Sequence, residues 1–169
     1  MTTTFGFGGN WLQFAADLKD QQIVEAQASL QKLLGRVNLS GLTFLDIGSG
    51  SGLFSLVARK LGARVRAFDF DPDSVTCTRL LRDRYFPGDD DWTVERGSIL
   101  DTAYTDRLGT FDIVYSWGVL HHTGAMWTAL ERAASLVARD GVLAIALYRR
   151  TPYVVHGVSR NASTRQRRA

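Results

Sequence analysis

Residues 42–52, LTFLDIGSGSG, combine a short apolar run with three glycines at alternate positions. The run at 42–47 is nearly continuous and is interrupted near its end by Asp46, a pattern typical of a strand buried on both faces of a parallel sheet. Apolar residues with helical spacing then begin at Leu53. A strand, a glycine-rich turn and a helix in this order predict the mouth of a nucleotide-type site at the carboxyl end of a strand.

Length and composition predict one globular domain with a core of its own, because the chain has 169 residues and 45% hydrophobic content. The sequence contains no apolar run long enough to span a membrane, and its first residues lack the pattern of a secretory signal. Cys77 is the single cysteine, so an intramolecular disulfide framework is excluded and a reducing compartment is indicated. We therefore expect a cytoplasmic protein.

Basic residues are unevenly distributed along the chain. The net charge is +3, from 20 Lys and Arg against 17 Asp and Glu, but six arginines follow Tyr148 in a segment without acidic residues. Subtracting these six leaves 14 basic residues, so residues 1–148 carry a net charge of −3. We expect a folded core at 1–148 that does not bind nucleic acid, with a helical lead-in at 1–40, and a basic, disordered tail at 149–169.

Strand and helix patterns alternate along the chain after the lead-in. Strands are predicted at 42–47, 64–69, 92–95, 111–117 and 142–148, and one or two helices at 11–34, then helices from 53, at 71–85 and at 125–137, with a turn at 140–141. Asp71 followed by Pro72 is a typical helix start, and Gly35 a typical stop. The alternation predicts the α/β class: a doubly wound, Rossmann-like, mostly parallel sheet of about five strands with N-terminal helices.

The glycine spacing narrows the ligand class. A dinucleotide-binding loop typically has the pattern G-x-G-x-x-G, whereas here the glycines stand at 48, 50 and 52 and Leu53 takes the place of the third dinucleotide glycine. A large residue at the start of the helix disfavours a pyrophosphate lying against it. The loop therefore favours a ligand without phosphates.

Asp69 ends the second predicted strand, where doubly wound nucleotide-binding domains place an acid that binds ribose hydroxyls. A carboxylate there can accept two hydrogen bonds from the diol. The alternative is that Asp69 only caps the next helix, but Asp71 is better placed for capping. We therefore predict that Asp69 binds ribose.

These features together resemble the class I S-adenosylmethionine-dependent methyltransferases. The resemblance spans roughly residues 5–148 and rests on LDIGSGSG (45–52), FDFD (68–71), RGSILD (96–101), FDIVYSWGVLHHT (111–123) and LVARDGVLAIALY (136–148), in this order. It implies S-adenosylmethionine as the cofactor, S-adenosylhomocysteine as its product, and a small-molecule methyl acceptor.

The resemblance also implies roles for individual residues. In that family the glycine loop lies against the methionine part of the cofactor, residues matching Ser98 and Ile99 flank the adenine, and the strand matching 111–117 ends beside the sulfonium. The family often has Asp where Ser98 stands, and Asp101 is the nearest acidic substitute. The implied cofactor-binding residues are Asp46, Gly48, Ser49, Gly50, Gly52, Asp69, Phe70, Ser98, Ile99, Trp117, Gly118 and Trp11.

The N-terminal segment FGFGGNW (5–11) resembles a lead-in that folds over the cofactor in one branch of the family. Phe7 and Trp11 would then wall the site, where an aromatic face attracts a sulfonium cation. The alternative is that these aromatic residues only pack the first helix.

His121 and His122 follow the carboxyl end of the fourth predicted strand, where doubly wound folds bind their ligands. One of them could act as general base for a hydroxyl or amine acceptor, or the pair could only shape the pocket. No closed zinc shell can be assembled around them, so we expect no metal.

The family usually has two further strands after the fifth, and the resemblance stops near residue 150, so we expect a fold truncated at that end. The fifth strand would then present an apolar edge open to a second copy of the chain. The leading hypothesis is methyl transfer to an O, N or C atom of a small molecule. The alternatives are a non-catalytic module that binds the cofactor or associates with itself, and a nicotinamide-dependent oxidoreductase, which Leu53 disfavours.

Overall fold

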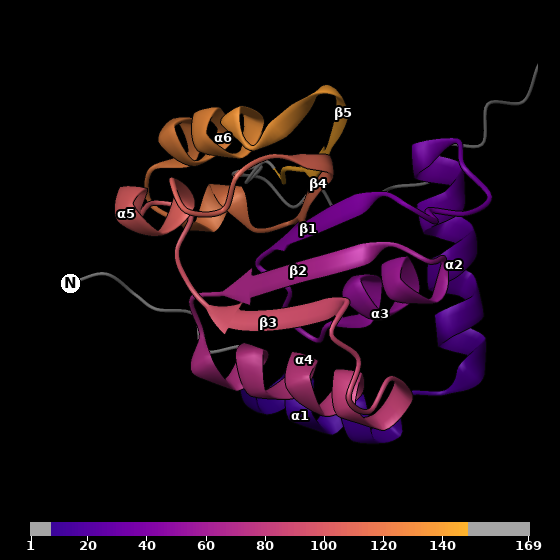
Figure 1. The fold of residues 1–169 in the computed structure, drawn as a ribbon. Coiled ribbons are helices and arrows are strands. Elements are labelled where there is room, and N and C mark those ends of the chain that lie inside the picture. Colours follow the sequence, from indigo (N-terminus) through magenta and orange to yellow (C-terminus); the bar gives the residue numbers. More distant parts are fainter. Residues whose placement is uncertain (1–7, 149–169) are drawn as a thin grey trace, which may run out of the picture.

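The structure is a computed structural model that describes residues 8–148, with side chains from residue 13 onward. Its centre is a five-stranded sheet in the order β3-β2-β1-β4-β5, and every pair of neighbouring strands is parallel (Figure 1). The strands are β1 (Thr43–Ile47), β2 (Arg64–Asp69), β3 (Trp92–Arg96), β4 (Phe111–Trp117) and β5 (Val137–Ala146). The predicted doubly wound, parallel α/β fold is confirmed.

The central strand β1 determines where a ligand can approach. Phe44 pairs with Val65 of β2 on one side and with Ile113 of β4 on the other, and all three side chains are buried. The chain runs outward from β1 to β2 and β3, and then returns to the other side of β1 as β4. Connections that leave in opposite directions open a crevice at the carboxyl ends of β1 and β4, which is where such sheets bind ligands.

Helices cover both faces of the sheet. One apolar core packs residues of α1 (Gly8–Asp17), α2 (Asp20–Leu34), α3 (Leu53–Lys60) and α4 (Pro72–Tyr85) against one face (Figure 1). A second core packs α5 (Thr102–Thr105), the 3-10 helix η1 (Leu120–His122) and α6 (Met126–Ser135) against the other. Cys77 lies in the first core and is fully buried.

Two predicted helix boundaries are confirmed by their backbone geometry. Gly35 ends α2 in the left-handed conformation at φ 63°, which glycine adopts without steric cost. Asp71 caps α4 by accepting a hydrogen bond from the Asp73 amide at 3.1 Å, with Pro72 at the first helical position. The lead-in contains two helices, α1 and α2, and the second begins where the Lys19 amide donates to Gln22 Oε1.

The boundaries near the fifth strand were predicted wrongly. Helix α6 ends at Ser135 instead of residue 137, and β5 spans Val137–Ala146 instead of 142–148. The predicted turn at 140–141 is a bulge inside the strand, because Phe111 pairs with Val137 but Ile113 pairs with Val142. A Cβ at Gly141 would come within 2.9 Å of the Phe111 and Asp112 carbonyl oxygens, so glycine allows β5 to pass close to β4 there.

Some predictions fall on parts of the chain that the structure does not describe. The basic tail at 149–169, Phe7 and the side chain of Trp11 lie outside the described residues.

None of the helices within residues 8–148 is both long enough and apolar enough to cross a membrane.

Candidate functional site

The loop after β1 has the backbone geometry that requires glycine. Gly48, Gly50 and Gly52 all have positive φ values, of 76°, 53° and 80°. A Cβ at Gly48 would come within 2.4 Å of Val119 Cγ1, and one at Gly52 within 2.9 Å of Thr78. The loop is therefore held tightly against the segment after β4 and against α4, with no space for side chains at these two positions.

Hydrogen bonds fix this loop to the neighbouring strand. The Gly48 and Ser49 amides both donate to the Phe68 carbonyl, at 2.9 and 3.2 Å. Ser49 Oγ lies 3.0 Å from Thr78 Oγ1 in a buried contact with α4. The loop is thus held in one conformation by its own backbone and by its contact with α4.

Asp69 connects two of the segments that border the crevice. Its Oδ2 accepts a hydrogen bond from the Gly50 amide at 2.9 Å, and its Oδ1 accepts one from the Asp71 amide at 2.9 Å. Burial raises the pKa of Asp69, although these two backbone hydrogen bonds oppose the increase. Capping of α4 by Asp71 leaves Asp69 free of that role, and each carboxylate oxygen of Asp69 retains a lone pair for a further donor.

Asp46 lies behind the glycine loop. The carboxyl group is 2% exposed and accepts a 2.6 Å hydrogen bond from Ser55 Oγ of α3. Burial raises its pKa to about 7, and the negative charge of Asp69 adds to the increase. Asp46 is therefore placed to support the loop from inside the core.

The predicted adenine-flanking residues lie after β3. The Gly97 amide donates to the Asp69 carbonyl at 3.0 Å, which brings this segment beside the end of β2. Ile99 is 4% exposed in the second core, and Ser98 Oγ accepts a hydrogen bond from the Leu100 amide at 3.2 Å. Asp101 instead caps the short helix α5, because its Oδ1 accepts from the Tyr104 amide.

Phe70 extends from the end of β2 with 61% of its surface exposed. The Arg96 guanidinium lies over its ring at 5.8 Å, and Arg96 Nε donates to the Phe70 carbonyl at 3.2 Å. Phe70 thus provides apolar surface beside the end of β2, whereas Ile99 is buried in the second core.

An aromatic cluster forms a wall at the carboxyl end of β4. Trp117 is 42% exposed and stacks on buried Tyr115, with ring centroids 5.9 Å apart and planes 7° from parallel. Gly118 follows with φ 74°, and a Cβ there would come within 2.7 Å of the Tyr148 ring. Tyr148 is itself 60% exposed, so the wall offers two accessible aromatic rings.

The two histidines lie beside this wall. Their ring centroids are 4.0 Å apart, and the His121 and Tyr148 rings are nearly perpendicular, with centroids 5.4 Å apart. His121 Nδ1 is buried and has no hydrogen-bond partner among the described residues. Burial, together with the charge of His122, lowers the pKa of His121, which favours a neutral imidazole able to accept a proton.

The structure also identifies site residues that sequence reasoning missed: Val119 against Gly48, Thr78 against Gly52, Ser55 on Asp46, and Tyr148 over Gly118. Thr78 could have been found, because it shares the buried face of α4 with Val75 and Leu81 at helical spacing. Tyr148 could not, because nothing in its local sequence indicates which loop it covers. Across the part of the chain with described side chains, no group of three or more metal-ligating residues is suitably placed for a metal ion.

Comparisons with known proteins match this arrangement. A family profile described as "Methyltransferase domain" matches residues 45–145. Ubiquinone biosynthesis O-methyltransferase from Xanthomonas campestris pv. campestris (strain B100) is 33% identical over 123 residues, which are 73% of this chain and 50% of that protein. The protein from Xanthomonas oryzae pv. oryzae (strain PXO99A) with the same name is 32% identical over the same share of each chain. The chain spans about half the length of these relatives.

Solved structures share the fold at lower sequence identity. A putative S-adenosyl-L-methionine-dependent methyltransferase from Methanococcus maripaludis aligns with a TM-score of 0.66 at 18% identity, over 83% of this chain and 62% of that one. Magnesium protoporphyrin IX methyltransferase from Synechocystis PCC 6803, solved with bound SAM, aligns with a TM-score of 0.56 at 21% identity, over 79% of this chain and 60% of that one. These similarities support the fold.

Proposed function

Because the chain belongs to the methyltransferase domain family, we propose that it binds S-adenosylmethionine and transfers its methyl group to a small molecule. The observation that carries the proposal is the Asp69 carboxylate, which the Gly50 and Asp71 amides hold beside a loop whose three glycines all have positive φ. When bound, this cofactor supplies a methyl group on a positively charged sulfonium, which leaves readily as a neutral thioether.

The chain's own residues fit such a ligand. The glycine loop would lie against the methionine part, Asp69 would accept hydrogen bonds from the ribose diol, and Phe70 and Ile99 would flank the adenine. Trp117 and Gly118, with Trp11 from the lead-in, would border the sulfonium. Aromatic faces attract a cation.

Calorimetric titration with S-adenosylhomocysteine tests cofactor binding. We expect saturable binding to the wild-type protein and a loss of about tenfold or more in affinity for Asp69→Asn, because the amide cannot accept two hydrogen bonds from a diol. The matched control is Asp112→Asn, since Asp112 also accepts a backbone hydrogen bond, from Thr43 at 2.8 Å, but lies at the opposite ends of β1 and β4. Equal losses in the two variants, or no binding by folded wild-type protein, would refute the proposal.

We further propose that the acceptor is an aromatic hydroxyl compound and that His121 is its general base. The exposed Trp117 and Tyr148 rings offer flat surfaces for a planar acceptor, and the named relatives are O-methyltransferases. The His121 ring lies beside Tyr148, and its lowered pKa keeps the imidazole neutral and able to take the hydroxyl proton. The hydroxyl proton would pass to His121 as the oxygen forms its bond to the methyl carbon and the carbon–sulfur bond breaks, with catalysis resting largely on alignment.

The pH dependence of turnover tests the role of His121. Because its pKa is lowered, activity on a panel of phenols and catechols should rise with pH below the ordinary histidine range and then become constant. His121→Gln should lose about 100-fold or more in kcat and should no longer show this pH dependence. His122→Gln serves as the matched control: it should keep most of the activity and the rise with pH, with the midpoint moved upward because the charge of His122 no longer lowers the pKa of His121. A flat wild-type profile, or equal losses in both variants, would show that the pair only shapes the pocket.

A second candidate function is self-association, which we infer from the position of β5 at the edge of the sheet. Among the described residues β5 pairs only with β4, and Val142, Leu147 and Tyr148 are 40%, 38% and 60% exposed. An open apolar edge is a template for a second chain. Sedimentation velocity should detect a concentration-dependent dimer that Val142→Lys weakens and that Val24→Lys, a similar change on α2, leaves intact. A monomer at every concentration, or equal effects of the two variants, would exclude association through β5.

A further inference from the structure

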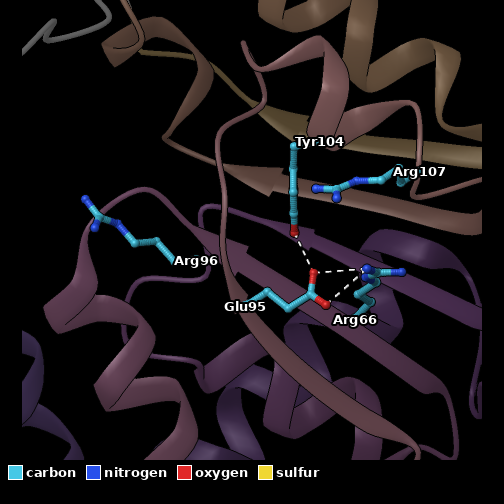
Figure 2. Close-up of a pocket in the computed structure, with 5 residues that line it drawn as sticks. All are labelled: Arg66, Glu95, Arg96, Tyr104 and Arg107. Atoms are coloured by element: carbon cyan, nitrogen blue, oxygen red, sulfur yellow. Dashed lines mark hydrogen bonds and ion pairs between the residues drawn. The ribbon is translucent and has the colours of Figure 1, made fainter.

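A pocket of about 450 Å³ lies outside the candidate cofactor site, beside the face of the sheet that carries Arg66 and Glu95. It is lined by Arg66 of β2, Glu95 and Arg96 of β3, Tyr104 of α5 and Arg107 (Figure 2). Three arginines against one glutamate give the lining a formal charge of +2, although residues 1–148 as a whole are acidic. Sequence reasoning did not identify this pocket, because its members are spread over four segments.

The single acid of the pocket is already occupied. Glu95 accepts hydrogen bonds from Arg66 Nη2 at 3.0 Å and from the Tyr104 hydroxyl at 2.9 Å. Burial raises the pKa of Glu95, but the hydrogen bonds from Arg66 and Tyr104 outweigh it and leave the pKa lowered. Burial and the charge of Glu95 raise the pKa of Tyr104. Glu95 is therefore a fixed anion, and Tyr104 remains a neutral donor to it.

The arginines, by contrast, retain donors without partners. Arg66 Nε is buried and has no hydrogen-bond partner within the described residues. Arg107 forms no ion pair in that part of the chain, and its guanidinium lies 6.0 Å from the centre of the Tyr104 ring. Figure 2 shows the guanidinium groups of Arg66 and Arg107 on the same side of Tyr104, with Arg96 on the other side. A buried N–H group without a partner is costly, so a ligand that satisfies it gains affinity.

We propose that this pocket binds the phosphate group of a small molecule, held mainly by Arg66 and Arg107. Guanidinium groups match phosphate oxygens in geometry and form charge-assisted hydrogen bonds with them. A phosphate monoester carries close to two negative charges at neutral pH, which balances the formal charge of the lining, whereas one carboxylate would leave half of it uncompensated. Arg96 adds to the local positive field from beside Phe70.

The inference is independent of the proposed methyl transfer. The side chains of the pocket donate no hydrogen bond to Asp69 or to the glycine loop, and the two sites adjoin where Arg96 pairs with Asp69 across β2 and β3 and contacts Phe70. If the protein binds S-adenosylhomocysteine but not phosphate, this inference alone is refuted. If it binds phosphate but not S-adenosylhomocysteine, the proposed function alone is refuted.

Titration of the full chain with inorganic phosphate and with glycerol 3-phosphate, followed by amide NMR shifts at constant ionic strength, tests the inference. We expect saturation with a Kd on the order of 1 mM or tighter, with shifts concentrated at residues 66, 95–96 and 104–107. Tighter binding of the ester than of inorganic phosphate would indicate a phosphorylated metabolite, and equal binding would indicate phosphate itself.

Two arginine variants decide whether phosphate binds in this pocket. Arg107→Met should weaken binding about tenfold, whereas Arg36→Met, a change at an exposed arginine after α2, should leave it unchanged. Each spectrum also reports whether the variant is folded. Shifts scattered over the basic tail, equal weakening in both variants, or no saturation would overturn the proposal.

Discussion

Asp46 is a carboxylic acid inside the core, and its burial makes its contribution to the free energy of unfolding depend on pH. In the folded protein burial raises its pKa from 3.8 to about 7, while Ser55 opposes this increase through its hydrogen bond. The folded state therefore holds the proton more tightly than the unfolded state does. By linkage, the stabilisation that this difference provides is complete below pH 3.8 and is lost as pH rises through about 7.

Asp46→Asn should remove this pH dependence, because the amide does not titrate. We expect the free energy of unfolding of the variant, relative to that of the wild type, to increase between about pH 4 and pH 7 by a few kcal/mol at most. Urea denaturation of both proteins across this range measures the difference. A difference that stays constant with pH would mean that Asp46 is ionised in the folded state throughout.

At the scale of elements, the turn between β2 and α4 acts as one unit. Asp69 accepts hydrogen bonds from the Gly50 and Asp71 amides, while Asp71 caps α4 through the Asp73 amide and also accepts from Ser74 Oγ. The two acids thus have separate roles. Asp69 joins the glycine loop to this turn, and Asp71 starts the helix.

Asp71→Ala should cost about 1 kcal/mol of stability through loss of the cap, with little effect on S-adenosylhomocysteine affinity. Chemical denaturation and calorimetry measure the two quantities. Asp83→Ala, a change at an exposed acid in the last turn of the same helix, should stay within about 0.5 kcal/mol of the wild type. A large loss of affinity in Asp71→Ala with unchanged stability would show that Asp71, and not Asp69, binds the ligand.

Local sequence predicted most elements but not the start of β5. Strands such as Phe111–Trp117 are mostly apolar, and α4 has a cap and a proline that mark its beginning. The Asp140-Gly141 pair looks like a turn because both residues favour turns. In the folded protein Gly141 passes close to the β4 backbone, and pairing with β4 keeps the segment within the strand. A tertiary contact here overrides the local preference.

At the scale of the whole molecule, the sheet order brings the candidate site together. The order β3-β2-β1-β4-β5 places the carboxyl ends of β1, β2 and β4 at one end of the sheet, so that Asp69, the glycine loop and His121 all follow strands that end there, although they are far apart in sequence. The family match over residues 45–145 covers all of these positions.

The sequence by itself determined the parallel sheet, the glycine loop, the aspartate that ends β2 and the family, because each depends on short-range patterns of apolar residues, glycines and acids. Only the tertiary structure decided that Asp46 lies behind the loop, that Tyr148 covers Gly118 and meets His121, and that Arg66 and Arg107 share a pocket. These features depend on which strands become neighbours and how side chains pack between them. That information is distributed over the whole chain and is not present in any one segment.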